Sequence, residues 1–361
     1  MAKITAGGDI NKGDLINKGK YPVIANGLNN NGIVGYSNKY KIDAPAVTIT
    51  GRGTLGVATA RFINFTPIVR LISIKSDLDP IYLENVINNT HFVIESTGVP
   101  QLTAPQVKRQ TVILSNCHIE QTKIGSLFLT LDNAITLHEE KIRQLERLKS
   151  ALLQKMLADK SGYPAVRFEG FGGKWDQCKL GNVGTFRGGF GFPENEQGNI
   201  DGIAFYKVSD MNDSCNTLTM RKASNYVTSS QISKNKWKPI LNQNIIFAKV
   251  GAAVYLERKR KAMGPFLLDN NMMAFQPKDA DIDYIYYVFQ RLRISKHAQV
   301  GTLPSLNASE LRNITIYIPS LNEQKAVADL MVSLDHTIIL YDFKLELLKK
   351  LKSSLLQHMF I

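Results

Sequence analysis

Two long stretches of the chain repeat apolar residues at spacings of three and four, which is the pattern of one face of an α-helix. The first stripe consists of Leu131, Ile135, His138, Ile142, Leu145, Leu148, Leu152 and Met156. The second consists of Leu334, Ile338, Tyr341, Leu345, Leu348, Leu351, Leu355 and Met359. Each stripe predicts a main helix of about 28 residues, which is ~42 Å long at 1.5 Å per residue.

The two stripes belong to an internal duplication with a spacing of 203 residues, and a repeat of this kind decides the fold. The matching segments are Glu120-Gln121 with Glu323-Gln324, Leu131-Asp132 with Leu334-Asp335, Lys149-Ser150 with Lys352-Ser353, and Leu152–Met156 with Leu355–Met359. The spacing is too long for a solenoid, so it indicates duplication of a whole domain with its helix. A Ser320-x-x-Glu323 capping box opens the second helix, whereas Cys117 replaces the serine in the first, which predicts a weaker cap.

Two exposed apolar stripes in one chain most simply cover each other, so we expect an intramolecular coiled coil. The alternatives are homodimerisation through either helix, and plain helix packing inside a larger core. Lys149 and Lys352 interrupt the stripes at matched positions, which argues against the plain core helix. The residues expected to pack the two helices together are Ile135, Ile142, Leu145, Leu152, Ile338, Tyr341, Leu345, Leu348 and Leu355.

The rest of the chain contains short β-branched and aromatic runs separated by Gly, Asn and Pro, which is typical of strands with tight turns. Expected strands include Tyr21–Ile24, Ala46–Thr50, Pro67–Ile74 and Asn244–Val250, and expected short helices are Ile81–Asn89 and Ile282–Arg293. The fold class is therefore α+β, with two mixed domains in tandem and a long helix after each. We expect a first domain over 1–116, a central helical segment over 117–160, a second domain over 161–318 and a C-terminal helical segment over 319–361.

The composition is that of an ordinary globular protein, with 44% hydrophobic and 21% charged residues,. No apolar run approaches the roughly 18–20 residues that cross a bilayer, and the first residues lack the apolar core of a secretory signal. Three widely separated cysteines argue against a disulfide framework and favour a reducing, cytoplasmic setting. We therefore expect a cytoplasmic protein with no membrane partner.

The charge is strongly unbalanced, with 44 Lys and Arg residues against 31 Asp and Glu residues and a net charge of +13. Such an excess favours a polyanionic partner, most simply nucleic acid. Residues 221–261 carry ten basic side chains and only one acid, Glu257. The alternative interpretation of this run is a solvated basic face.

No catalytic set is recognisable in the sequence. There is no phosphate-binding loop and no pair of Cys or His residues with zinc spacing, so we expect no catalytic residue, no metal and no cofactor on this chain. Glu257-Arg258-Lys259 has the E-x-K form of metal-dependent nucleases, but no clear acidic partner precedes it. A stand-alone metal-dependent nuclease and a dimerising protein adaptor without DNA binding stay open as alternatives.

Several features fit DNA contact instead. Thr48–Gly56 reads as a strand that ends in a glycine-rich turn presenting Arg52, and Lys249 sits at the matching place in the second half. Glycines let the backbone approach a phosphate, and the basic side chain can add charge or read a guanine edge. The Asn-rich stretch at Asn26 could read adenine, although Asn-Gly clusters are turn formers first. The candidate DNA-contacting residues are Lys20, Asn26, Thr50, Arg52, Thr54, Arg61, Lys207, Ser209, Arg221, Lys222, Lys249, Arg258 and Lys259.

The order of these motifs resembles the specificity subunit of type I restriction-modification enzymes. Tyr163–Phe171 and Trp175–Gly181 resemble the opening of a target recognition domain in that family. Phe205–Met211, the Thr50–Thr54 turn and the Glu-Gln-led helices that end in Leu-Leu-Gln-x-Met are similar to the same family. The resemblance covers essentially the whole chain.

The resemblance implies two target recognition domains that each read one half of a split double-stranded DNA site. It implies that the helices pack as an antiparallel spacer with pseudo-twofold symmetry and dock two methyltransferase subunits, which carry S-adenosylmethionine. Motor-nuclease subunits, which would bring ATP and magnesium, are the further partners that it allows. The specificity subunit itself does no chemistry. Because the loops of the two halves differ in sequence, the DNA site should be asymmetric.

The first half departs from the family pattern at its start. In the second half residues 163–184 precede Phe186-Arg187-Gly188, whereas the first half begins almost directly at the equivalent Lys3-Ile4-Thr5. The expected opening, including its Trp and Lys-Leu-Gly, does not precede this segment. We therefore expect the first target recognition domain to be shortened at its N-terminal side.

Overall fold

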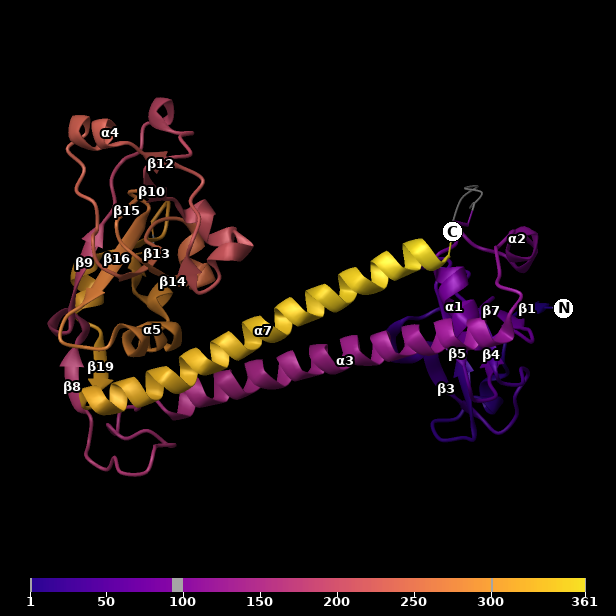
Figure 1. The fold of residues 1–361 in the computed structure, drawn as a ribbon. Coiled ribbons are helices and arrows are strands. Elements are labelled where there is room, and N and C mark those ends of the chain that lie inside the picture. Colours follow the sequence, from indigo (N-terminus) through magenta and orange to yellow (C-terminus); the bar gives the residue numbers. More distant parts are fainter. Residues whose placement is uncertain (1, 93–99, 300, 361) are drawn as a thin grey trace. The chain divides into compact units, whose positions relative to one another are not determined.

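The computed structural model of the chain describes residues 2–92, 100–299 and 301–360 and divides into two compact units (Figure 1). Unit 1 comprises residues 1–142 and 341–361, and unit 2 comprises residues 143–340. Two long helices, α3 (His118–Lys155) and α7 (Leu321–Met359), each run from one unit into the other. Each unit therefore holds the first part of one helix and the last part of the other.

Unit 1 is built on a four-stranded antiparallel sheet with the strand order β1-β7-β4-β5, beside a three-stranded sheet with the order β3-β2-β6. Helix α1 covers one face of the larger sheet, where Leu83 and Ile87 pack against Val47, Ile49 and Ile72. The elements are β1 (Lys3–Ala6), β2 (Tyr21–Ile24), β3 (Ile33–Ser37), β4 (Ala46–Ile49), β5 (Ala58–Arg61), β6 (Thr66–Pro67), β7 (Ile72–Lys75), α1 (Pro80–Asn88) and α2 (Ala104–Arg109).

The predicted strand Pro67–Ile74 is wrong as a single element. Val69 and Arg70 adopt positive φ angles of 50° and 62°, which extended backbone does not allow. The run therefore ends β6, turns, and begins β7. Nothing in the sequence marks this turn, because neither residue is a Gly, Asn or Asp that favours such angles.

Unit 2 repeats the same plan with more strands. A five-stranded sheet in the order β11-β14-β13-β16-β9 packs one face against α5, and a three-stranded sheet in the order β12-β10-β15 lies beside it. Short two-stranded pairs join β17 with β18 and β19 with β8. The elements are β8 (Asp176–Lys179), β9 (Gly184–Gly188), β10 (Ile203–Tyr206), β11 (Thr219–Met220), β12 (Tyr226–Val227), α4 (Ser229–Lys234), β13 (Asn244–Ala248), β14 (Lys259–Ala262), β15 (Phe266–Leu268), β16 (Met272–Pro277), α5 (Ile282–Arg291), β17 (Ala298–Gln299), β18 (Ser305–Leu306), α6 (Ala308–Arg312) and β19 (Thr315–Ile318).

The two units start their sheet-covering helix in the same way. The carboxylate of Asp79 accepts hydrogen bonds from the backbone of Ile81 and Tyr82 at the start of α1, and Asp281 accepts one from Tyr284 at the start of α5. Such N-caps satisfy amides that have no partner inside the helix. The expected pair of mixed α/β domains, each followed by a long helix, is confirmed.

In unit 1 the start of α3 packs against the end of α7. Ile124, Phe128 and Leu131 of α3 form a cluster with Leu348 and Leu355 of α7. Asp132 accepts a hydrogen bond from the ammonium group of Lys352 at 2.5 Å, and Glu139 pairs with Lys349 at 2.7 Å. Rising residue numbers in one helix thus meet falling numbers in the other, so the helices are antiparallel here.

In unit 2 the end of α3 packs against the start of α7. Lys149 forms an ion pair with Asp335, which also accepts a hydrogen bond from the Tyr287 hydroxyl at 2.7 Å. Asp132 and Asp335 are separated by 203 residues, as are Lys352 and Lys149. The lysines that interrupt the two apolar stripes therefore form reciprocal ion pairs with the duplicated aspartates.

The predicted stripe residues are buried to different degrees. Ile142 and Leu145 are buried, while Ile135, Leu152, Ile338, Tyr341, Leu345, Leu348 and Leu355 are partly buried. Leu148 and Leu351, which are also separated by 203 residues, are each 48% exposed. The helices are longer than the stripes indicate, with 38 residues in α3 and 39 in α7.

At the start of α7 the Glu323 carboxylate, which the predicted capping box assigns to the helix cap, bonds to other side chains. Glu323 is buried, and its carboxylate accepts hydrogen bonds from Arg167 at 2.7 and 2.8 Å and from the Trp175 indole at 3.2 Å. The segment before β9 is thereby held against α7. In unit 1 the matching residue, Glu120, is exposed and bonds to Ser115. Among the described residues, none pairs with 111–114 as β8 pairs with β19.

The reciprocal ion pairs predict unequal losses of stability. Side-chain exposures are 25% for Lys149 and 5% for Asp335, but 27% for Lys352 and 43% for Asp132. Lys149→Met leaves a buried carboxylate with one hydrogen bond and should lower the free energy of unfolding by about 1.5–3 kcal/mol. Lys352→Met removes a surface pair and should cost about 0–1 kcal/mol.

Both tryptophans, Trp175 and Trp237, lie in unit 2, so their fluorescence during urea unfolding reports Lys149→Met. Circular dichroism at 222 nm reports both variants. The exposed neighbours Ser150→Ala and Ser353→Ala serve as matched controls. Equal small losses for the two lysine variants would contradict the expected difference.

Candidate nucleic-acid interface

The turn that follows β4 in unit 1 is closed by its own side chains. The backbone of Thr50 exchanges hydrogen bonds with Val57 and Gly56 at 2.9–3.0 Å, and the Thr50 hydroxyl bonds to the Thr54 carbonyl. Gly53 and Gly56 have φ angles of +72° and +80°, which glycine adopts without strain. This arrangement leaves Arg52 and Thr54 exposed at the tip, while Thr50 is buried and closes the turn.

Asn26 fastens a second turn to the first. Its amide oxygen accepts a hydrogen bond from the Gly51 amide at 2.7 Å, and its amide nitrogen donates to the Val69 carbonyl. The Val69-Arg70 turn therefore lies against the Arg52 turn. Arg70 is exposed and donates to Gln101 at 3.2 Å. The sequence prediction missed Arg70, because it lay inside a run that reads as a strand.

Two other predicted residues of unit 1 have different surroundings. Lys20 is exposed and lies 5.3 Å from the centre of the Tyr21 ring. Arg61 donates to the Thr48 hydroxyl at 3.0 Å and to the Asn31 carbonyl at 2.9 Å. Burial lowers the pKa of Arg61 below its usual value. Arg61 thus braces the sheet against the 29–32 turn, which makes it a weaker candidate for DNA contact than Arg52.

In unit 2 a buried asparagine, Asn216, holds a basic loop that lies between β10 and β12. Asn216 has no exposed surface, and its amide nitrogen donates to the carbonyls of Asp210 and Lys222 at 2.8 Å. Its amide oxygen accepts from the backbone of Arg221 at 2.7 Å and of Lys222 at 3.1 Å. Asp210 accepts two further hydrogen bonds from Ser224.

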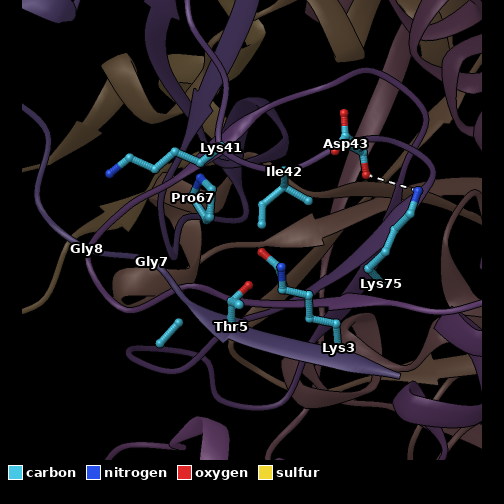
Figure 2. A pocket seen from close by; sticks show the side chains of 11 residues that line it. Lys3, Thr5, Gly7, Gly8, Lys41, Ile42, Asp43, Pro67 and Lys75 are labelled. Carbon is cyan, nitrogen blue, oxygen red and sulfur yellow. Dashed lines mark hydrogen bonds between the residues drawn. The ribbon is translucent and has the colours of Figure 1, made fainter. Parts of the chain in front are cut away.

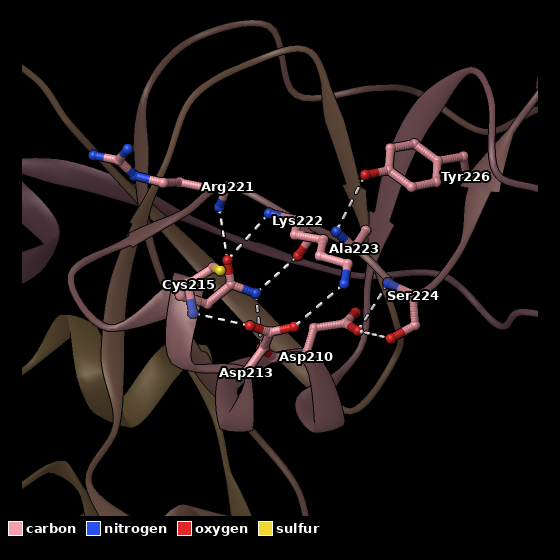
Figure 3. Close-up of polar contacts among 9 residues, drawn as sticks. Asp210, Asp213, Cys215, Arg221, Lys222, Ala223, Ser224 and Tyr226 are labelled. Carbon is pink, nitrogen blue, oxygen red and sulfur yellow. Dashed lines mark hydrogen bonds and ion pairs between the residues drawn. The ribbon is translucent and has the colours of Figure 1, made fainter. Parts of the chain in front are cut away.

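Figure 3 shows the outcome of this network for the two basic side chains. The Arg221 guanidinium extends away from the bonded groups, and both Arg221 and Lys222 are exposed. The Lys222 ammonium group turns back to within 3.9 Å of the Asp213 carboxylate. Because the backbone of this loop is held by buried bonds, Arg221 projects from a fixed position.

Residues 258–260, where β14 begins, support the same loop. Arg258 bonds to the Asn212 side chain, and Arg260 donates to the Asn216 carbonyl at 2.5 Å. Burial lowers the pKa of Arg260. Two of the arginines in the basic run therefore hold a loop through their guanidinium groups. Lys207 likewise bonds to Gln197 at 3.0 Å, whereas the neighbouring Ser209 is exposed.

Lys259 does not suit the predicted DNA contact, because only 1% of its surface is exposed. Its ammonium group donates to Glu257 at 2.5 Å and to the Leu292 carbonyl at 2.9 Å. Glu257 in turn accepts from the Ser295 amide at 2.9 Å. Burial lowers the pKa of Lys259. The Glu257-x-Lys259 pair is thus a buried brace between β14 and the segment after α5.

Lys249 lies one residue before the position that corresponds to Arg52. Its carbonyl accepts a hydrogen bond from Leu306 at 2.8 Å at the end of β13, and the Gly51 carbonyl accepts one from Leu102 at 2.9 Å at the end of β4. Lys249 therefore corresponds to Gly51, one residue before Arg52. Its side chain is partly exposed, so both turns offer a cation at the same edge of the sheet.

Other kinds of site find little support in the part of the chain that the structure describes. No group of three or more His, Cys, Asp or Glu side chains is placed to hold a metal ion there. Over the same residues, no helix is long and apolar enough to cross a membrane. The predicted DNA-contacting residues that lie exposed on the two basic loops are Arg52 and Thr54 in unit 1, and Arg221 and Lys222 in unit 2.

The chain belongs to the type I restriction-modification DNA specificity family, whose sequence pattern it matches over residues 1–147 and 172–350. Members of this family are the non-catalytic specificity subunits of type I restriction-modification complexes. A putative type I specificity subunit of Mycoplasma pneumoniae is 29% identical over 110 residues, which are 30% of this chain and 30% of that protein. The chain matches less than a third of the length of such curated relatives.

Solved structures that share this fold are also described as proteins of type I restriction-modification systems. The crystal structure of a type I restriction-modification S subunit from M. genitalium superimposes with a TM-score of 0.66 at 15% identity, covering 100% of this chain and 94% of that one. A structure described as the basis of complex assembly and conformational transition of the type I system gives a TM-score of 0.51 at 15% identity, over 88% and 81% of the chains. At such identities the likeness shows the fold alone.

The Asn216 network predicts a loss of stability without any change of charge. Asn216→Ala leaves two carbonyls and two amides in a buried loop without their partners, and should lower the free energy of unfolding of unit 2 by about 2–3 kcal/mol. Tryptophan fluorescence in urea measures this loss. Ser214→Ala, an exposed neighbour, should change it by less than about 0.5 kcal/mol. A loss as small as that of the control would mean that the network does not hold the loop.

Proposed function

We propose that this chain is the DNA-reading subunit of a type I restriction-modification complex and that each unit reads one half of a split site. The proposal rests on an arrangement of side chains that occurs in both units. In each unit a buried or half-buried asparagine holds a loop whose arginine is exposed: Asn26 with Arg52, and Asn216 with Arg221. Fixed backbone with a projecting cation suits phosphate contact and guanine readout.

The proposed division of labour follows the duplication. Residues 1–116 form the first target recognition domain and residues 161–318 the second, with the helical segments 117–160 and 319–361 as the spacer. The basic loops differ in sequence and in the strands that support them. Unit 1 uses two turns beside β4, whereas unit 2 uses a loop braced by β14. Two unlike reading surfaces favour an asymmetric DNA target.

The proposed partners are double-stranded DNA, two methyltransferase subunits that carry S-adenosylmethionine, and motor-nuclease subunits with ATP and magnesium. Exposed leucines that recur at the repeat spacing support two equal docking sites on the helices. Leu137 and Leu340 are 68% and 50% exposed, and Leu148 and Leu351 are 48% exposed. Large apolar side chains that recur on a helix surface favour protein contact. The three free cysteines are consistent with action in the cytoplasm.

The alternatives receive less support. A nuclease built on Glu257 and Lys259 would need both groups free to bind metal and substrate, but Leu292 and Ser295 occupy them. A dimerising adaptor would need free helix stripes, yet Ile142 and Leu145 are already buried within the chain.

The proposed function is tested by methylome sequencing of cells that express the chain with an active adenine methyltransferase partner. We expect a split motif with N6-methyladenine on both strands and a fixed gap. Arg52→Gln should relax one half of the motif and Arg221→Gln the other, since a guanine contact is worth roughly 1–3 kcal/mol of discrimination. Lys234→Gln, which removes a lysine paired with Glu196, is the control.

A continuous motif, or the same half of the motif relaxed by both arginine variants, would contradict the assignment of one half-site to each unit. If neither variant alters the motif, the two turns do not read bases. Binding assays on duplex DNA then show whether they contact phosphate, because the slope of log K against log salt should fall by about one per lost contact.

The docking proposal predicts subunit stoichiometry. Native mass spectrometry of the wild-type complex should show two methyltransferase subunits per chain. Leu137→Ser and Leu340→Ser should each reduce this to one, and the double variant to none, because each removes a central apolar contact of one site. Gln154→Ser and Gln357→Ser, exposed and also related by the repeat, are the controls. Unchanged stoichiometry in the double variant would exclude this leucine pair as a docking contact.

A further inference from the structure

A pocket of about 460 Å³ lies in unit 1, between β1 and the segments around Ile42 and Pro67. Figure 2 shows that the Lys3 ammonium group and the Thr5 side chain point into this space, while the Lys41 side chain, which also lines the pocket, extends away from them. Gly7 shapes the wall, since a Cβ atom at this position would lie 2.6 Å from the carbonyl carbon of Pro67. The volume is within the usual range of about 300–1,000 Å³ for ligand sites.

The floor of the pocket carries the hydroxyl group of Ser73. Ser73 lines the pocket and is 1% exposed, and its Oγ atom has no hydrogen-bond partner among the residues that the structure describes. Its strand neighbours are Thr5 and Thr48, and the Thr48 hydroxyl is bonded to Thr59 and Arg61. Leaving a buried polar group unpaired costs about 1–3 kcal/mol, so the orphan hydroxyl points to a ligand that completes it.

The lining of the pocket is net positive, because it contains Lys3, Lys41 and Lys75 but, as an acid, Asp43. Lys3 lies directly opposite Lys75 in the antiparallel pair of β1 and β7, and like charges in this position repel each other. Lys75 is bonded to the carbonyls of Asp43 and Pro45 at 3.3 and 2.9 Å, but Lys3 and Lys41 bond to no side chain among the described residues. The Asp43 carboxylate lies beside Tyr40, whose pKa it raises.

Unit 2 shows that the fold does not require this chemistry. Ile74 pairs with Ile4 in unit 1 as Phe275 pairs with Phe186 in unit 2, and both pairs face the covering helix. With this register, Lys3 and Lys75 correspond to Thr185 and Gln276, and Ser73 corresponds to Ala274. Thr5 corresponds to Arg187, so unit 2 has a cation of its own on this face, at a different position. The facing lysines and the orphan hydroxyl are thus particular to unit 1.

We propose that this pocket binds a phosphate group through Lys3, Thr5 and Ser73, with Lys41 adding positive charge to the lining. Ammonium and hydroxyl groups all donate, and the oxygens of one phosphate can accept from several donors at once. The phosphate belongs either to the DNA backbone or to a free phosphate-bearing molecule. The first source rests on the proposed DNA-reading function, and the second does not.

The first test uses the full chain and no DNA. Isothermal titration with inorganic phosphate, compared with chloride at equal ionic strength, should show saturable binding to the wild type. Lys3→Gln should weaken it by roughly ten-fold or more, as expected for a charge-assisted hydrogen bond. Ser73→Ala should weaken it by roughly three- to ten-fold without loss of stability, because it removes the unpaired hydroxyl and installs the residue that unit 2 has. Lys18→Gln, an exposed lysine outside the pocket, should bind as the wild type does.

The second measurement separates the two sources. If the phosphate is that of DNA, inorganic phosphate competes with duplex DNA, and Lys3→Gln lowers the salt slope of DNA binding by about one. If it is a free ligand, Lys3→Gln loses phosphate binding but keeps the DNA affinity and slope of the wild type. Absence of saturable phosphate binding by the wild type, or equal binding by the wild type, Lys3→Gln and Ser73→Ala, overturns the proposal whatever the chain does with DNA.

Discussion

The covering of two long apolar helix stripes is the constraint on which the rest of the structure depends. Neither α3 nor α7 could keep its stripe in water, and in both units the end of one helix covers the start of the other. Apolar contact alone is tolerant of sliding, since a shift of one heptad brings similar side chains together. The reciprocal pairs Asp132–Lys352 and Lys149–Asp335 remove this freedom, because a shift in either direction separates a lysine from its carboxylate and strands Asp335 in the core.

Buried polar side chains fix the backbone of the loops, just as the ion pairs fix the register of the helices. Asn26 and Asn216 each bond to backbone groups of turns and loops that connect the strands. Such bonds fix the loop backbone without occupying the exposed basic side chains beside it. The exposed side chains of Arg52 and Arg221 can therefore be replaced without loss of the bonds that hold the loops, which suits the DNA-reading role proposed above.

The sequence was informative wherever one pattern was repeated. The stripes, the 203-residue spacing and the strand–turn signals predicted the α/β units and the paired helices, because periodicity reports burial directly. Side-chain roles were predicted less well. The positive charge of residues 221–261 does not distinguish exposed Arg221 from buried Lys259, because the distinction depends on which loop folds over β14. Arg70 was missed for the related reason that its turn is imposed by Asn26, a residue far away in the chain.

Comparison of the two duplicated units also distinguishes residues that the shared fold requires from residues that are particular to one unit. Where the two units agree, as in the aspartate caps of α1 and α5, the shared feature is explained by the frame. Where they differ at matched register, as at Ser73 against Ala274 or Lys3 against Thr185, stability of the frame offers no reason for the costlier residue. A buried hydroxyl that lacks a partner among the described residues and a lysine that faces another lysine both oppose folding. A negatively charged group bound by Ser73 and Lys3 most simply explains why unit 1 has both.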